Sequence, residues 1–177
     1  PIMGKLTYEY CAMTGAGGSQ LGKQMEMYNC IMAPDPKNAL LTGTKFGSVD
    51  TLSGYKIHDT LLICGDGESN TPFTFETSNN IDIQRCTFKP SWSPAYNGRA
   101  LKFVSCRNIT IHNNDLCSGV RFQMSSVVRM NTNRLSANPD GQRSYTTNTS
   151  AHMIEILFQC NDIIIRDFQI ATGTAGR

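Results

Sequence analysis

FTFETSNNIDIQRCTF (73–88), LKFVSCRNITIHNNDL (101–116) and VRFQMSSVVRMNTNRL (120–135) align over sixteen residues without a gap. Five positions are apolar in all three segments; in the first segment they are Phe73, Phe75, Ile81, Ile83 and Phe88. Apolar residues two apart are typical of strands that face a core, and their return at fixed places indicates stacked coils. The alignment therefore predicts a solenoid of short strands.

The second half of this pattern forms a frame that occurs six times. The frames begin at Met25, Tyr55, Ile81, Ile109, Val128 and Ile163. Apolar residues follow two places later at Met27, Ile57, Ile83, Ile111, Met130 and Ile165, and seven places later at Met32, Leu62, Phe88, Leu116, Leu135 and Ile170. Each frame predicts a strand with two inward side chains, a corner and another inward side chain.

The spacing of the frames narrows the choice of solenoid. Successive frames lie 30, 26, 28, 19 and 35 residues apart, which excludes the tighter periods of leucine-rich, ankyrin and left-handed hexapeptide repeats. We expect an all-β parallel β-helix of about six coils with variable loops. Parallel strands joined by crossovers are right-handed in roughly 98% of cases, so a right-handed helix is predicted.

Two further columns predict the corners of the coils. Three residues before the frame stand small residues, namely Ser78, Cys106, Ser125 and Cys160. Directly before it stand Asn80, Asn108 and Asp162. Asn and Asp tolerate left-handed backbone geometry, and their side chains can form ladders from coil to coil.

Length and charge limit the possible functions. The 177 residues suffice for one domain, with residues 1–24 as a joint or lead-in and residues 25–177 as the β-helix. The start at Pro1 and the end soon after a complete frame predict a segment of a longer chain. A net charge of +2 without a basic run argues against a nucleic-acid partner. The segment contains no apolar run long enough to span a membrane and no signal-like leader.

Seven cysteines raise the question of disulfides or a metal site. Cys30 and Cys86 share one column, and Cys106 and Cys160 share another, but an intervening coil places each pair about 9.6 Å apart. This exceeds the reach of a disulfide. We therefore expect buried free thiols that behave as small apolar groups, in a protein that folds in a reducing cytoplasm. We expect no metal and no cofactor.

Residues 73–170, with frames such as FVSCRNITIHNNDL, resemble the pectate-lyase-like right-handed β-helix, and more narrowly the shafts of bacteriophage tailspikes and tail fibres. The resemblance implies a homotrimer of parallel shafts in a virion tail, folded in the bacterial host cytoplasm. It also implies contact with other phage tail proteins and binding, sometimes cleavage, of bacterial surface polysaccharide. Fold and function are separate inferences, because one fold hosts many functions.

A glycosidase works with paired carboxylates roughly 5 to 9.5 Å apart. The resemblance implies instead that a lyase of this fold relies on a calcium-binding cluster of acids with an arginine as base, and no such cluster stands out among the scattered acids. The outward columns contain no acids in neighbouring coils. Glu76 and Asp82 are the remaining weak candidates, because they flank one corner; the alternative is that both are ordinary surface carboxylates.

Two long insertions offer candidate glycan-binding residues. Lys89–Ala100 contains Trp92, Tyr96 and Arg99, and Ala137–His152 contains Arg143 and Tyr145. Long loops on a rigid scaffold often carry binding function, and aromatic faces beside guanidinium groups suit sugars. The alternative is that Trp92 and Tyr96 cover the end of the core or pack against a neighbouring chain.

Three functional hypotheses remain. The first is a non-enzymatic phage shaft segment that binds a polysaccharide receptor. The second is a polysaccharide depolymerase, hydrolase or lyase, of the same fold. The third is a bacterial adhesin.

Overall fold

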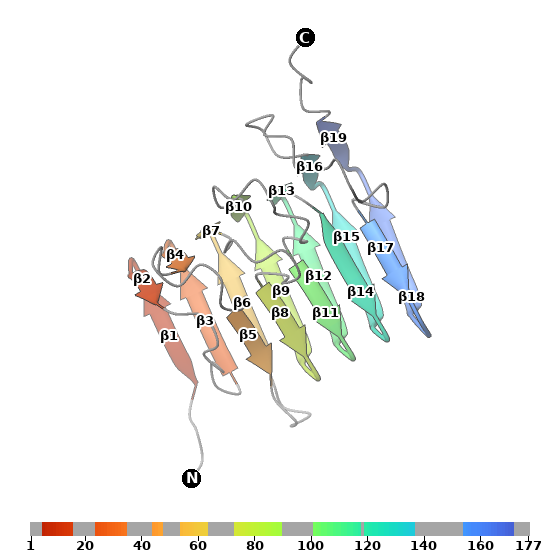
Figure 1. The fold of residues 1–177 in the computed structure, drawn as a ribbon, viewed down its shortest axis with the longest axis horizontal. Helices are drawn as coiled ribbons and strands as arrows, with labels where there is room; N and C mark the ends of the chain where they lie inside the picture. Colours follow the sequence, from red (N-terminus) through yellow and green to blue (C-terminus); the bar gives the residue numbers. More distant parts are fainter. Residues whose placement is uncertain are drawn as a thin grey trace.

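Parallel β-sheets form the whole of the described architecture in the computed structural model (Figure 1). The structure describes residues 5–15, 24–34, 44–47, 54–63, 73–89, 101–117, 119–136 and 154–171. Within these ranges every regular element is a strand, and every strand pairing is parallel. The predicted all-β parallel solenoid architecture is therefore confirmed.

The strands belong to three sheets, which we call A, B and C. Sheet A contains β1 (Leu6–Glu9), β3 (Gln24–Tyr28), β6 (Gly54–His58), β9 (Asn79–Gln84), β12 (Arg107–His112), β15 (Ser126–Asn131) and β18 (Asn161–Arg166). Sheet B contains β2 (Ala12–Gly15), β4 (Ile31–Pro34), β7 (Leu61–Ile63), β10 (Thr87–Lys89), β13 (Asp115–Cys117), β16 (Arg134–Ser136) and β19 (Gln169–Ala171). Sheet C contains β5 (Thr44–Gly47), β8 (Phe73–Glu76), β11 (Leu101–Val104), β14 (Val120–Gln123) and β17 (Ile154–Leu157).

The strand register confirms the alignment of the frames. The residues that begin the six frames pair with one another across sheet A, from Met25 to Ile163. The residues seven places later pair across sheet B, from Met32 to Ile170. Each coil therefore sends two side chains inward from sheet A and one from sheet B, as the frame predicts.

Sheet C supplies the aromatic part of the core. Phe75, Phe103 and Phe122 pair in register and stack, with ring centroids 5.2 and 5.3 Å apart. All three rings are fully buried. Opposite them, Tyr55 occupies an inward position of sheet A; burial raises the pKa of its hydroxyl, which hydrogen-bonds the Ser78 hydroxyl. The corner hydroxyl thus allows a tyrosine in an otherwise apolar core.

The corners repeat one backbone conformation. Between sheets A and B a residue with positive φ precedes a small, inward side chain, as at Arg85 (φ 52°) and Cys86. The corner between sheets C and A has the same form at Thr77 (φ 50°) and Ser78. Asn80 adopts a φ of 56° as well, so the predicted left-handed column is confirmed there.

Residues 5–15, which lie within the expected lead-in, contribute strands to two sheets. β1 pairs with β3 and β2 pairs with β4, and Figure 1 shows these strands next to each other at the red end of the stack. The pairing aligns Tyr8 with Met27 and Met13 with Met32. The corner Cys11 corresponds to Cys30, whose Sγ accepts a hydrogen bond from the Cys11 N–H at 3.5 Å.

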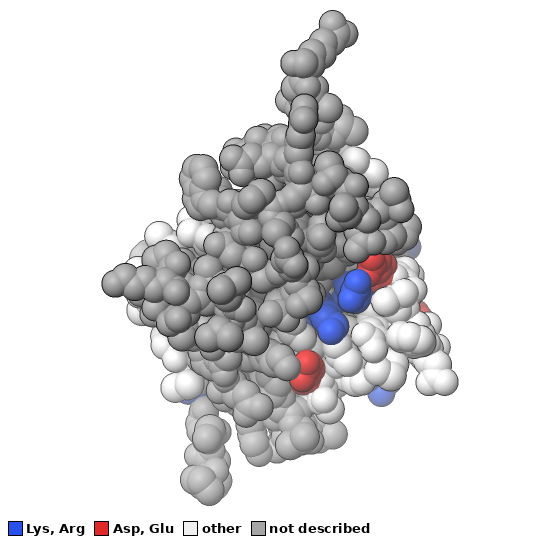
Figure 2. Space-filling view, in the orientation of Figure 1, with Lys and Arg blue, Asp and Glu red and all other residues white. Residues whose placement is uncertain are grey.

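On the face drawn in Figure 2, the visible basic and acidic atoms of the described residues lie close together among uncharged ones. In the part of the chain that the structure describes, no helix is long and apolar enough to cross a membrane.

Candidate functional site

The outer face of sheet A presents polar side chains in rows that cross the coils. Because side chains alternate along a strand, the residues between the buried columns point outward. The middle row contains Glu26, Lys56, Asp82, Thr110 and Arg129. The far row contains Tyr28, His58, Gln84, His112 and Asn131. The corner row contains Asn29, Asp59, Arg85, Asn113 and Thr132. Neighbouring residues of a row repeat at the strand spacing of about 4.8 Å.

At the β1 side of this face, one carboxylate lies between two lysines. The Lys5 Nζ is 2.6 Å from one oxygen of Glu26, and the Lys56 Nζ is 3.2 Å from the other. The hydrogen bond from Lys5, followed by that from Lys56, holds the pKa of Glu26 below its ordinary value despite partial burial. Glu26 therefore stays ionised at neutral pH, and the cluster carries a net charge of +1 from these three groups.

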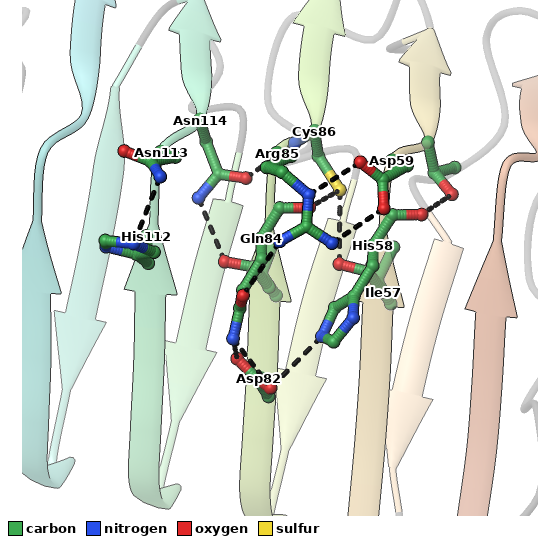
Figure 3. Close-up of polar contacts among 12 residues, drawn as sticks. Ile57, His58, Asp59, Asp82, Gln84, Arg85, Cys86, His112, Asn113 and Asn114 are labelled. Carbon is green, nitrogen blue, oxygen red and sulfur yellow. Dashed lines mark hydrogen bonds and ion pairs between the residues drawn. The ribbon is translucent and has the colours of Figure 1, made fainter.

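A second polar network joins β6 and β9 (Figure 3). The Nε2 of His58 is 3.1 Å from Asp82 Oδ2, and the Gln84 amide donates to both oxygens of Asp82 at 2.8 and 3.0 Å. Arg85 donates to Gln84 Oε1 at 3.1 Å and to the two oxygens of Asp59 at 2.7 Å each. The guanidinium lowers the pKa of Asp59, so this carboxylate is fixed in its charged form. The five side chains form one continuous chain of contacts between two coils.

Tyr28 extends this network toward the lysine cluster. Its ring meets the His58 ring edge to face, with centroids 5.4 Å apart. Burial, and then the Glu26 carboxylate, raise the pKa of the Tyr28 hydroxyl. The ring is partly exposed, so an aromatic face lies among charged and amide groups.

A further polar cluster on β12 and β15 consists of an imidazole and two amides. The two ring nitrogens of His112 lie 3.1 Å from Asn131 Oδ1 and 3.1 Å from Asn113 Nδ2. Figure 3 shows His112 and Asn113 side by side next to the Arg85 network. Beyond them, a hollow of about 360 Å³ follows the corner; Asn113, Asn114, Asp115, Thr132, Asn133, Arg134, Asp167 and Gln169 line it. The ion pair between Asp115 and Arg134, with the two atoms 3.2 Å apart, lies in this hollow.

The candidate catalytic carboxylates lie on different sheets. Asp82 belongs to the middle row of sheet A, whereas Glu76 ends β8 in sheet C. The corner Thr77–Ser78 separates them, as the sequence indicates. Asp82 is engaged by His58 and Gln84. The carboxyl groups with a clear shift, Glu26, Asp59 and Asp162, all have a lowered pKa, which is opposite to the requirement for a general acid.

The five candidate glycan-binding residues of the loops, namely Trp92, Tyr96, Arg99, Arg143 and Tyr145, lie outside the described residues. The polar contacts found on sheet A come instead from residues that the frame leaves outward. The Asp59–Arg85 pair was within reach of sequence reasoning, because the two residues are neighbours in one column. The His58–Asp82 contact is diagonal and joins two different columns, so no single column indicates it.

The described thiols are free and have a structural role. Cys11, Cys30, Cys86, Cys106 and Cys160 form no disulfide. Burial raises the pKa of Cys86 and of Cys106 to about 12, so both thiols stay protonated and unreactive at neutral pH. Among the described residues no group of three or more His, Cys, Asp or Glu side chains is arranged to hold a metal ion.

Comparisons with known proteins return no match among family models, curated proteins or solved structures. A functional proposal for this chain therefore depends on its outer surface.

Proposed function

We propose that this chain is a polysaccharide-binding shaft segment of the phage tailspike and tail-fibre type, built as a right-handed β-helix. One observation carries the proposal: from β3 to β12, the middle and far rows on the outer face of sheet A form a polar surface with an aromatic ring in it. Tyr28, His58 and Gln84 form successive positions of its far row. A linear polymer of sugars matches such a surface, because both repeat polar groups along one direction.

The side chains on this face suit carbohydrate hydroxyls. Amides and imidazoles both donate and accept hydrogen bonds, and Arg85 presents a planar group with several donors. The Arg85–Asp59 and Gln84–Asp82 contacts hold these groups in place before a ligand arrives. A preorganised surface loses less entropy on binding than one whose side chains must be ordered.

Binding is favoured over cleavage by the state of the carboxylates. Asp59 forms a bidentate ion pair with Arg85, and Asp82 accepts hydrogen bonds from the Gln84 amide. The Arg85 guanidinium lowers the pKa of Asp59 and so holds this carboxylate in its charged form, and Asp82 positions the neighbouring Gln84 amide. A glycosidase needs one carboxylic acid that keeps its proton.

The proposed assembly is a homotrimer of parallel shafts in a virion tail, formed after folding in the bacterial cytoplasm and attached to other tail proteins. Its ligand is bacterial surface polysaccharide. In this arrangement the face of sheet A is exposed to the ligand, and the ladder of coils supplies a rigid support.

A matched pair of glutamines tests the proposal. Gln84 lies on the outer face of sheet A, whereas Gln123 lies on the outer face of sheet C. On an array of bacterial capsular and lipopolysaccharide glycans, we expect the wild-type chain to bind, Gln84→Ala and Tyr28→Ala to bind at least tenfold more weakly, and Gln123→Ala to bind normally. At the lowest protein concentrations, light scattering should give the mass of three chains. No binding by the wild type to any glycan, or equal loss for both glutamine variants, would refute this function.

A further inference from the structure

A single glycine interrupts the side chains on the outer face of sheet A. A near row precedes the middle row and contains Lys5, Gln24, Gly54 and Asn80. At Gly54 this row lacks a side chain, and a hollow of about 260 Å³ occupies the place. Its lining consists of Lys5, Gln24, Met25, Glu26, Gly54, Tyr55, Lys56 and Asn80.

Nothing in the fold requires a glycine at this position. Gly119 is the only described glycine with a positive φ, so the backbone at Gly54 is open to other residues. A Cβ built on Gly54 would meet no atom within 4 Å, so packing does not exclude a side chain either. A glycine in a strand interior weakens the strand or marks a close approach of a ligand. The hollow is therefore space that the local structure leaves open.

The charges around the hollow select the chemistry of a ligand. The ammonium groups of Lys5 and Lys56 outnumber the Glu26 carboxylate between them. Each ammonium has three N–H donors, and its ion pair with Glu26 uses one of them. The lysine side chains are 49% and 53% exposed, whereas that of Glu26 is only 14% exposed. A ligand that enters therefore meets positive charge first, with the amides of Gln24 and Asn80 beside it.

The size of the hollow limits the ligand to a small unit. Pockets for drug-sized ligands measure roughly 300 to 1,000 Å³, and this hollow is slightly smaller. It suits one sugar ring rather than an extended segment. Tyr28 lies two residues along β3 from Glu26, so a neighbouring sugar in a chain would reach the aromatic ring.

We propose that the hollow over Gly54 is a subsite for one carboxylate-bearing sugar residue of the bound polysaccharide, an inference that rests on the proposed function. The sugar carboxylate pairs with the ammonium groups of Lys5 and Lys56. Its hydroxyls hydrogen-bond the amides of Gln24 and Asn80. This inference specifies where the polysaccharide binds, and it specifies that the polysaccharide is an acidic rather than a neutral glycan.

The test fills the hollow without disturbing the fold. Gly54→Gln introduces a side chain where a Cβ meets nothing, and Val104→Gln places the same side chain on the outer face of sheet C, away from the hollow, as a control. The probes are the uronate-containing glycan that binds best on the array and the same glycan after chemical reduction of its carboxyl groups, titrated by calorimetry. Thermal unfolding verifies that both variants are folded.

We expect Gly54→Gln to weaken binding of the acidic glycan at least tenfold, and Val104→Gln to leave it unchanged. Reduction of the carboxyl groups should weaken binding to the wild type by a similar factor, and added salt should weaken binding only of the unreduced glycan. If Gly54→Gln or reduction leaves the affinity unchanged, the subsite is wrong while polysaccharide binding stands. If the wild type binds no glycan, the proposed function fails and the subsite with it.

Discussion

At the scale of single residues, the coils depend on backbone conformations that most side chains resist. Fifteen described residues other than glycine have positive φ, and they recur at the same places in successive coils. In one such column, Asn80, Asn108 and Asp162 are of types that tolerate this region, and the Asn108 amide donates to Asn80 Oδ1 at 3.1 Å. Val127 occupies the same column with a φ of 54°. A β-branched residue in this region is strained.

Replacement of this valine should stabilise the protein. Val127→Asn removes the β-branched strain and places an amide next to Asn108, so we expect a gain of about 1 kcal/mol in the free energy of unfolding, of the order of the cost of left-handed backbone. Urea unfolding measures the change. The reverse substitution, Asn108→Val, should lower stability by at least as much, because it also removes the hydrogen bond to Asn80. A loss of stability for Val127→Asn would show that its methyl groups contribute more than the strain costs.

Residue type alone predicts only part of this column. Asn80, Asn108 and Asp162 suggest left-handed geometry from their chemistry, but a valine argues for an extended strand. Only the gapless alignment places Val127 with Asn108, because the backbone of each coil is imposed by the coils on both sides. The alignment therefore predicts the position of Val127 in the coil correctly, although the preference of valine for an extended strand is misleading there.

At the scale of elements, the corners explain the small polar columns. The Oδ1 of Asn114 accepts from the Cys86 N–H at 2.8 Å, and its Nδ2 donates to the Ile83 carbonyl at 3.0 Å. Thr60 and Ser125 accept in the same way from the backbone N–H groups of Cys30 and Cys106, at 3.4 and 3.3 Å. Buried backbone groups need such partners. The corner thiols and hydroxyls are therefore hydrogen-bonding groups, a role that goes beyond that of small apolar fillers.

Replacement of the corner residue Asn114 by a smaller residue should reveal this role. Asn114 is 3% exposed, and Asn114→Ala removes the hydrogen bonds that its side chain forms with the buried Cys86 N–H and the Ile83 carbonyl. A buried group that loses its partner costs about 1 to 3 kcal/mol, so we expect a loss of about 1 to 3 kcal/mol in urea unfolding. Asn114→Thr restores the acceptor that Thr60 supplies elsewhere and should cost clearly less. Asn131→Ala, an exposed change on the neighbouring strand, should stay within about 0.5 kcal/mol. Equal losses for Ala and Thr at position 114 would mean that packing, not the hydrogen bond, is responsible.

The six frames were sufficient to predict the strands of sheets A and B from Met25 onward, but they miss the first coil. LTYEYCAM (6–13) has the spacing of MEMYNCIM (25–32), including the corner cysteine. Tyr10 and Ala12 are weaker signals than Asn29 and Ile31, so the likeness rests on few residues.

The side-chain contacts on the outer surface are harder to predict from the sequence than the strands are. Side chains such as His58 and Asp82 meet diagonally, and only the three-dimensional twist of the sheet decides which outward residues touch.

At the scale of the whole molecule, the stack has apolar surfaces at its described ends. Ile156 and Ile170 in the last coil are 50% and 56% exposed, whereas Phe122 and Leu135, one coil earlier in the same columns, are 0% and 1% exposed. In the first coil Leu6 is 46% exposed, although its partner Met25 is buried. Phe168 stands where other coils place a hydrogen-bonding corner residue, and it is 44% exposed. Solenoids normally cover such faces with polar caps.

A chain of these 177 residues should therefore associate end to end. In sheets A and B the two end faces carry the same inward columns in the same order, so one copy can continue the stack of another, and such a head-to-tail contact does not close. Light scattering should give a mass that grows with concentration, beyond the fixed mass of three chains expected from side-by-side assembly.

The double variant Ile156→Lys with Ile170→Lys should abolish this growth in mass, because it places charges on the apolar end face. Thr7→Lys with Asn161→Lys, which adds the same charge at exposed outward positions of the end coils, should leave it intact. If both double variants keep a growing mass, the contact lies on the sides of the stack; if the wild-type mass is constant, the end faces do not associate.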